Sequence, residues 1–168
     1  MSEIMTDTMM TEEQNNEDTM HNKFLVFELE KQQYAIAIEN VVDIINVQPV
    51  THVPNCPDFV RGITNLRGKV IPIIDVRIRF GMAERDYDDR TCIIVVELHG
   101  IPVGMIIDSV SEVITLDEGD IAPPPTFSNV VDARFIEGIG KTEQGIRLIL
   151  DCAAVLDDEG MLAAAGME

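Results

Sequence analysis

FLVFELEKQQYAIAIENVVDIINV, residues Phe24–Val47, decides the fold because the same pattern occurs a second time later in the chain. Shifted forward by 69 positions, it aligns without gaps with Ile93–Leu116, IIVVELHGIPVGMIIDSVSEVITL. The identical positions are Val26/Val95, Glu28/Glu97, Leu29/Leu98, Ile38/Ile107, Val41/Val110 and Ile45/Ile114. Ordered similarity of this kind is hard to obtain from composition alone, so we interpret it as an internal duplication.

A second block repeats at a different spacing. FVRGITNLRGKVIPIID, Phe59–Asp75, aligns with FIEGIGKTEQGIRLILD, Phe135–Asp151, after a shift of 76 positions. The difference between the two shifts is an insertion in the Pro-rich loop Asp120–Asn129. Two copies are too few for a solenoid, so they predict two similar small β-units that lie side by side.

The composition favours strands around a core of Ile, Val and Leu. Hydrophobic residues make up 46% of the 168, aromatic residues only 5%, and there is no Trp. β-Branched residues pack well on a pleated surface. Each copy spans roughly 60 residues, a size at which burial is marginal, so we expect each copy to need the other.

The net charge of −18 is placed unevenly along the chain. Met1–Asn22 carries six acidic residues and no Lys or Arg, which predicts a disordered tail. This segment lacks the basic flank and apolar run of a signal peptide, and no stretch of the chain approaches a membrane span. We therefore expect a soluble, cytoplasmic protein.

Turn signals between short apolar runs predict an all-β fold with brief helices, arranged as a pair of small barrels. We expect one domain at 23–158, flanked by a disordered acidic tail at 1–22 and a second tail at 159–168. The expected parts of the domain are a subdomain at about 23–80, the polar linker Gly81–Arg90 and a subdomain at about 91–157.

Several local assignments follow from the same patterns. Lys23–Glu30 and Gln32–Ile38 alternate on either side of a polar turn, which predicts a hairpin. Glu39–Asn46 fits a helical turn or a short strand, and periodicity does not separate the two. Pro72 cannot donate to a ladder, so its strand is an edge strand or its nitrogen faces outward. Cys152–Asp158 is expected to form a short terminal helix.

The residue types of a catalytic or metal site are not grouped in this sequence. No metal-ligand or catalytic spacing relates its cysteines and histidines: Cys56, Cys92, Cys152, His21, His52 and His99. Asp75 and Asp151 could suggest a carboxylate pair. They occupy equivalent positions, however, each between a strand and an expected helix, where N-capping explains both. We predict no cofactor, no metal and no enzymatic activity.

The two copies differ most at Thr64–Lys69 (TNLRGK), which the second copy replaces with Gly140–Gly145 (GKTEQG). Gly68 is expected to adopt a positive φ in the tight turn of this hairpin, beside an exposed Leu66. Five of the twelve basic residues concentrate nearby: Arg61, Arg67, Lys69, Arg77 and Arg79. Because arginine combines a planar donor fork with apolar contact area, this basic edge predicts a protein-docking surface. A solvated hairpin tip remains the alternative.

The motifs resemble those of the CheW-type chemotaxis coupling proteins. FVRGITNLRGKVIPIIDVRIRFG, preceded by FLVFELEKQQYAIAIENVVDI and followed by PVGMIIDSVSEVITL, carries a resemblance that extends from about Phe24 to Leu156. The segment NLRG-x-V-x-P-I-x-D at Asn65–Asp75 is its most specific part. The resemblance implies two packed, five-stranded SH3-like β-barrels.

The resemblance also implies a function. The chain would be a non-enzymatic adaptor that links the cytoplasmic tips of methyl-accepting chemoreceptors to the regulatory domain of a CheA-type histidine kinase. It would be cytoplasmic and recruited to membrane receptor arrays. One alternative is a CheW-like adaptor of a non-flagellar pathway, such as pilus-based motility. Another is a small-barrel nucleic-acid-binding module, which would need a basic groove interleaved with aromatic residues.

The resemblance also assigns roles to individual residues of this sequence that match positions of the family's motifs. Gly62, Arg67 and Gly68 match the NLRG turn and the glycine before it, on the surface implicated in kinase and receptor coupling. Val41 and Asp43 match a Val-x-Glu of the family, with an acid one methylene shorter. Gly104 matches a family glycine where a missing side chain would permit close packing. The predicted partner-binding residues are Val41, Asp43, Arg61, Gly62, Leu66, Arg67, Gly68, Lys69 and Gly104.

Overall fold

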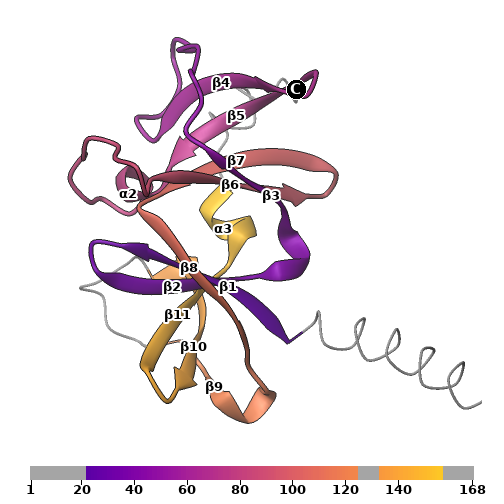
Figure 1. Cartoon of the computed structure of the whole chain (residues 1–168), viewed down its shortest axis with the longest axis vertical. Coiled ribbons are helices and arrows are strands. Elements are labelled where there is room, and N and C mark those ends of the chain that lie inside the picture. The colour runs from indigo at the N-terminus through magenta and orange to yellow at the C-terminus, as the bar shows by residue number, and fades with distance from the viewer. Residues whose placement is uncertain (1–21, 125–132, 157–168) are drawn as a thin grey trace, which may run out of the picture.

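The computed structural model describes residues 22–124 and 133–156, and these form two β-sheets with short helices (Figure 1). The expected tails at 1–22 and 159–168 lie almost entirely outside the described residues. The strands are β1 (Lys23–Leu29), β2 (Gln32–Ala37), β3 (Val41–Asn46), β4 (Val60–Leu66), β5 (Lys69–Asp75), β6 (Cys92–Leu98), β7 (Ile101–Ile107), β8 (Ser109–Thr115), β9 (Ile121–Ala122), β10 (Ile136–Thr142) and β11 (Gly145–Leu150). The helices are η1 (Ile38–Asn40), α2 (Val76–Arg79), η2 (Glu118–Asp120), η3 (Ala133–Phe135) and α3 (Cys152–Leu156). The prediction of an all-β fold with brief helices is confirmed.

Each sheet takes strands from both copies of the repeat. The six-stranded sheet has the order β8-β1-β2-β11-β10-β9, and the five-stranded sheet has the order β3-β6-β7-β5-β4. The two sheets therefore do not coincide with the expected subdomain ranges 23–80 and 91–157, which stay a prediction. The physical reason is that the chain leaves one sheet for the other within each copy, after β2 and again after β7.

The pairing pattern itself is duplicated. β1 pairs antiparallel with β8 of the second copy, and its counterpart β6 pairs antiparallel with β3 of the first. β2 and β11 run parallel, as do their counterparts β7 and β5. In each sheet, a hairpin from one copy pairs with strands of the other copy, and the two sheets do this in equivalent ways. This pattern agrees with an internal duplication.

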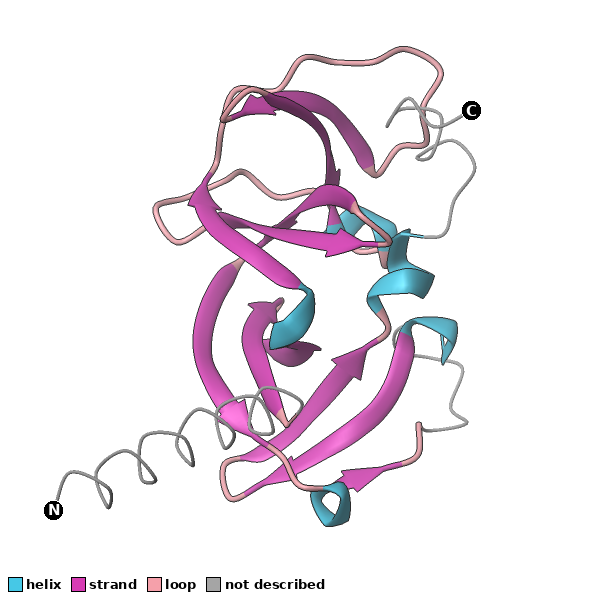
Figure 2. Ribbon diagram, turned by 90° about the vertical axis from the view of Figure 1, so that its right-hand side faces the viewer, coloured by secondary structure: helices cyan, strands magenta, loops and turns pink. Residues whose placement is uncertain are grey.

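The largest apolar cluster lies between the two sheets, which Figure 2 shows one above the other with short helices at their shared rim. It joins side chains of the six-stranded sheet, such as Phe27, to side chains of the five-stranded sheet, such as Ile94. Aromatic rings continue through it from Phe27 to Tyr34, Phe80 and Phe135, with centroid separations of 5.8, 5.7 and 5.2 Å. Apolar burial is the dominant favourable contribution to folding, so the two sheets stabilise each other.

Three local predictions can now be compared with the structure. Val41–Asn46 is strand β3, preceded by the single turn of η1, so the ambiguous segment is mainly a strand. Of the two alternatives for Pro72, the edge strand is wrong, because β5 lies between β7 and β4. Its parallel pairing with β7 begins at Ile73, so the proline precedes the paired stretch on that side. The terminal helix is confirmed over Cys152–Leu156.

Both strand-ending aspartates cap helices, as predicted. Asp75 Oδ1 accepts hydrogen bonds from the backbone N–H groups of Arg77 (3.0 Å) and Ile78 (3.4 Å) at the start of α2. Asp151 Oδ1 accepts one from Ala154 N–H (3.2 Å) in α3. Such bonds satisfy donors that the first helical turn leaves unpaired. Among the described residues, no helix is both long and apolar enough to cross a membrane.

Candidate functional site

The β4–β5 hairpin ends in a two-residue turn at Arg67 and Gly68. Leu66 pairs with Lys69, and the two turn residues have φ values of 53° and 88°. Positive φ at both central positions is the signature of a type I′ turn, whose twist matches the flanking strands. The Gly68 N–H donates to Asn65 Oδ1 at 3.0 Å, which fixes the turn from within. The predicted positive φ of Gly68 is confirmed, and Arg67 shares it.

Arg67 and Asp43, which are distant in the sequence, meet at this tip. The Arg67 Nη2 lies 3.0 Å from Asp43 Oδ2, in an ion pair rather than an aligned hydrogen bond. Asp43 projects from β3, the strand at one end of the five-stranded sheet, and its Oδ1 also accepts from Ile44 N–H at 2.9 Å. The Arg67 side chain is 78% exposed, so most of the guanidinium is available to a partner.

Exposed apolar side chains near this tip were not predicted. On β3, Val42 and Ile44 flank Asp43 and are 58% and 43% exposed; on β5, Val70 is 63% exposed. Val70 also lines a shallow hollow beside the hairpin, with Pro49, Thr51 and Asn65 among its other walls. The only available signal was the run VVDIIN, which is apolar on both faces and so shows no clear alternation. We call Asp43, Arg67, Lys69 and Val70 the hairpin surface; Val42 and Ile44 alternate with Asp43 along β3 and so point to the other side of that strand.

The predicted basic edge is not a single surface. Arg77 is buried and Arg79 is stacked over the rings of Phe59 and Phe135, with its guanidinium carbon 4.5 and 4.8 Å from their centroids. Arg61 forms an ion pair with Glu84 of the linker. Only Arg67 and Lys69 of the five basic residues belong to the exposed tip. The prediction of one surface was wrong because closeness in the sequence does not show toward which side of a helix or strand each side chain points.

Other predicted partner-binding residues lie inside the molecule. Leu66 is half-buried against the smaller core of the five-stranded sheet rather than exposed. Val41 packs partly against the main core. Gly62 is buried at φ 143°, where a Cβ would lie 2.1 Å from the Thr51 carbonyl oxygen. Gly62 and Leu66 thus support the β4–β5 hairpin from within, whereas Val41 belongs to the rim of the main core.

Gly104 has the close-packing role that its family position predicts. A Cβ there would lie 2.5 Å from Ile73 Cδ1 and 2.8 Å from Ile93 Cγ2, in the middle of the five-stranded sheet. Overpacking of this kind costs about 1–3 kcal/mol, so we expect Gly104→Ala to lower the free energy of unfolding by that amount. Gly119→Ala is the matched control, because a Cβ at Gly119 meets nothing within 4 Å. Equal urea midpoints for the two variants would contradict the packing account.

The second copy repeats the arrangement with the charge of its turn reversed. The equivalent of Arg67 is Glu143, and the equivalent of Asp43 is Glu112. Glu112 Oε1 lies 3.7 Å from Nη2 of Arg147, an arginine on β11 whose side chain is only 4% exposed. An acidic residue therefore faces an arginine in both sheets, but only Arg67 projects its guanidinium into solvent. The exposed arginine is therefore a feature of the first copy alone, whereas exposed apolar side chains recur in the second copy at Val113 and Ile146, the equivalents of Ile44 and Val70.

Comparisons with known proteins agree with this architecture. The family model described as the CheW-like domain matches residues 23–160. The chain is 37% identical to the chemotaxis protein CheW of Bacillus subtilis over 142 residues, covering 84% of this chain and 91% of the relative. It is 35% identical to that of Klebsiella aerogenes over 144 residues, covering 86% and 87%. The crystal structure of the scaffolding protein TtCheW from Thermoanaerobacter tengcongensis matches with a TM-score of 0.77 and 38% identity, covering 84% of this chain and 96% of that one.

Proposed function

The chain belongs to the CheW-like domain family, and we propose on that premise that it couples chemoreceptors to a histidine kinase. In this proposal it is a non-enzymatic adaptor of chemotaxis signalling. Its partners are the cytoplasmic tips of methyl-accepting receptors and the regulatory domain of a CheA-type kinase. It acts in the cytoplasm, where the receptor arrays recruit it.

The hairpin surface is the observation that carries the proposal. It combines an arginine whose side chain is 78% exposed with the 63% exposed Val70, at a two-residue turn between paired strands. Arginine and apolar groups together are typical of the centres of protein interfaces. The ion pair is exposed on the Arg67 side only, because Asp43 is 24% exposed and its Oδ2 is buried. A partner's carboxylate would therefore bind the exposed side of the Arg67 guanidinium while Asp43 keeps its contact.

Two other classes of function find less support in the geometry. Asp75 and Asp151 follow strands of different sheets, and each is engaged as a helix cap. A nucleic-acid site would need several basic side chains along one groove. Here Arg77 is buried, the half-buried Arg79 donates to the Val155 carbonyl oxygen, and Arg61 is paired with Glu84. The alternative of a non-flagellar pathway concerns the output of the adaptor and would use the same hairpin surface.

Affinity capture from the native cytosol and membranes tests the proposal. The full chain, used as bait, is expected to retain a histidine kinase and a methyl-accepting receptor together. An Arg67→Glu bait, which reverses the exposed charge at unchanged fold, is expected to retain far less of the kinase. Capture of neither protein by the wild-type bait would overturn the proposed function. The identity of the captured receptors distinguishes a flagellar from a pilus-based pathway.

A further inference from the structure

Arg67 has a backbone conformation that residues with a side chain rarely adopt. Its φ is 53°, at the first central position of the type I′ turn. Glycine, asparagine and aspartate are preferred at this position, because a Cβ crowds the backbone there. Other residues keep such a conformation only where surrounding groups hold them, and they occur disproportionately at functional sites. The groups that hold Arg67 are therefore informative.

Polar contacts, and not packing, hold the tip of this hairpin. A Cβ at Gly68 would meet nothing within 4 Å, and the Arg67 side chain is 78% exposed. The Gly68 N–H donates to Asn65 Oδ1 at 3.0 Å, whereas Arg67 Nη2 lies 3.0 Å from Asp43 Oδ2. Asn65 thus holds the main chain of the turn, and Asp43 holds the guanidinium of Arg67.

The hydrogen bond to Asn65 is not a requirement of this type of hairpin. The β6–β7 hairpin has the same two-residue turn, with φ values of 53° and 79° at His99 and Gly100. The exposed Glu97 takes the place of Asn65 there, and among the described residues no side chain accepts from the Gly100 N–H. The bond to Asn65 is therefore an additional restraint, present at the hairpin that carries Arg67.

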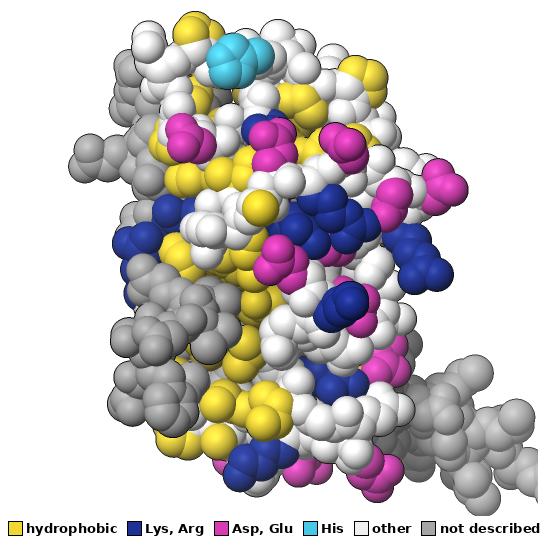
Figure 3. All heavy atoms as spheres, turned by 90° about the vertical axis from the view of Figure 1, so that its left-hand side faces the viewer, with side chains coloured by type: hydrophobic (Ala, Val, Ile, Leu, Met, Phe, Trp, Pro, Cys, Tyr) yellow, Lys and Arg dark blue, Asp and Glu magenta, His cyan; other side chains and the backbone are white. Residues whose placement is uncertain are grey.

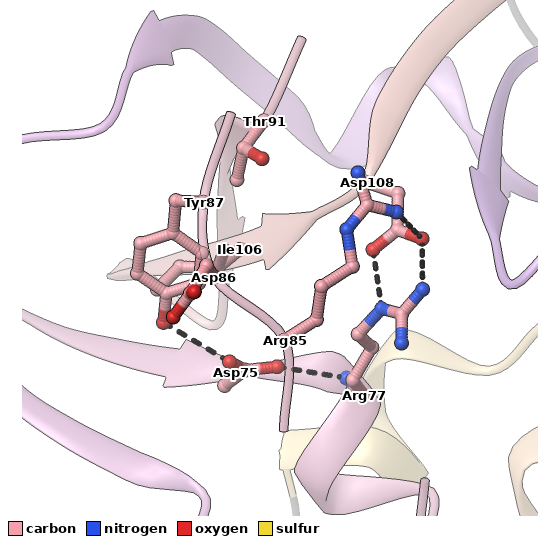
Figure 4. Close-up of a pocket in the computed structure, with 8 residues that line it drawn as sticks. All are labelled: Asp75, Arg77, Arg85, Asp86, Tyr87, Thr91, Ile106 and Asp108. Carbon is pink, nitrogen blue, oxygen red and sulfur yellow. Dashed lines mark hydrogen bonds and ion pairs between the residues drawn. The ribbon is translucent and has the colours of Figure 1, made fainter. Parts of the chain in front are cut away.

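The β1–β2 turn is also held by a side chain, but from a distant part of the fold. This turn lies on the left of Figure 1, and acidic and basic side chains are intermixed across the middle of that face (Figure 3). Its Glu30 N–H donates to Oδ2 of Asp108, which is 78 positions away in the sequence. Asp108 in turn accepts hydrogen bonds from Arg77 and Arg85 (Figure 4). The tertiary fold thus fixes that turn, whereas the β4–β5 turn is fixed by its own neighbour Asn65.

A restrained arginine binds a partner more tightly than a mobile one. Ordering a side chain or a loop on binding costs free energy, and a group already held in the bound conformation avoids that cost. The apparent dissociation constant rises in inverse proportion to the fraction of molecules in the competent conformation, so a fall of that fraction to about one tenth raises the constant about tenfold. Asn65 can thus strengthen binding without any contact to the partner.

We propose that Asn65 is a positioning residue, which presents Arg67 to its partner by holding the β4–β5 turn in the positive-φ conformation. The binding half of this statement rests on the proposed adaptor function, in which Arg67 contacts a carboxylate of the kinase. The restraint itself is a property of the free chain and does not depend on that function. The second copy has Lys141 in place of Asn65 and Glu143 in place of Arg67. Both the acceptor and the guanidinium are therefore replaced in that hairpin.

Amide nitrogen relaxation of the free, full-length chain tests the restraint. The order parameters of the Arg67 and Gly68 amides are expected to be about 0.85 in wild type, the value of a rigid backbone, and below about 0.6 in Asn65→Ala. Asn65→Asp keeps an acceptor oxygen at the same place, so it is expected to keep the order of wild type. Glu97→Ala is the matched control, because it truncates the equivalent position of the β6–β7 hairpin, where no such bond is lost. Equal order parameters in wild type and Asn65→Ala would overturn the proposal.

Titration with the isolated kinase regulatory domain tests the consequence for binding. It is carried out at about 0.15 M salt, where exposed charges more than about 8 Å apart are largely screened. The dissociation constant is expected to rise about tenfold in Asn65→Ala and to stay within about threefold of wild type in Asn65→Asp and Glu97→Ala. The urea midpoints of the variants should be nearly equal, because Asn65 and Glu97 are exposed.

The two measurements together distinguish positioning from direct contact. Weaker binding of Asn65→Ala at unchanged order parameters would show that Asn65 contacts the partner itself, and it would overturn positioning. Lost order in Asn65→Ala with binding equal to that of wild type would overturn the binding half of the proposal. A wild-type chain that binds no kinase domain would overturn the adaptor function, and the order parameters would still decide whether Asn65 restrains the turn.

Discussion

Neither half of the chain is expected to fold by itself. The fragment Met1–Gly81 would lose β8 and β11 from the six-stranded sheet, so its β1–β2 hairpin would stand alone. In the five-stranded sheet it would lose β6 and β7, which separate β3 from the β4–β5 hairpin. Isolated two-stranded hairpins are marginally stable at best in water. The fragment Arg90–Glu168 loses the equivalent partners, and each half would expose the core that lies between the sheets.

Thermal melts followed by circular dichroism and amide NMR measure this effect. Each fragment alone is expected to show no cooperative transition and little amide dispersion. Mixing or co-expressing the two is expected to restore the amide dispersion of the strands, because the omitted residues 82–89 lie in the linker and every strand is kept. A sharp cooperative melt of either isolated fragment would contradict the exchanged topology.

Arg67→Glu should weaken kinase binding severely while leaving the fold intact. Truncation of an interface hot spot typically costs about 2 kcal/mol or more, which is roughly a thirtyfold rise in dissociation constant. Reversal of the charge adds repulsion toward the acidic residue that Arg67 would contact. The cost to folding should be about 1–3 kcal/mol, because Asp43 Oδ2 is buried and loses the arginine that faces it. Isothermal titration with the kinase regulatory domain and urea unfolding measure the two quantities.

Two control variants distinguish the contribution of the Arg67 guanidinium to binding from the contribution of the turn's backbone conformation. Arg67→Asn removes the guanidinium but favours the positive φ of this turn, so it should bind weakly while the turn keeps its conformation. Lys141→Glu reverses an exposed charge on the second hairpin and should bind like wild type. Binding by Arg67→Glu as tight as that of wild type would show that the hairpin surface is not the docking site.

The strands of this fold can be predicted from sequence, but their partners cannot. Alternating runs such as Lys23–Leu29 and Gln32–Ala37 specify strands because one face must be buried. The repeat makes β1 and β6 alike, and likewise β3 and β8. By sequence pattern alone, β1 could pair with β3 or with β8, and so could β6. Which copy each strand joins is decided by chain crossings at η1 and Asp108, and these carry no periodic signal.

The site was predictable where local geometry determined it. The turn at Arg67–Gly68 and the caps at Asp75 and Asp151 follow from short-range rules about positive φ and unpaired helix donors. The prediction of a single basic edge was wrong because Arg77 binds Asp108, which is 31 positions away in the sequence. This contact forms only in the folded chain. For the same reason, the exposure of the Val42 and Ile44 side chains could not be predicted from the sequence. Their exposure depends on which face of β3 the rest of the sheet covers.

The most direct test of the adaptor assignment is receptor-stimulated autophosphorylation of the kinase. Purified kinase and receptor-containing membranes are assayed with the full chain, without it, and with Arg67→Glu in its place. The account predicts strong stimulation only when wild-type chain, kinase and receptor are all present, and little stimulation with the variant. Receptor-dependent stimulation that is equally strong without the chain would contradict it.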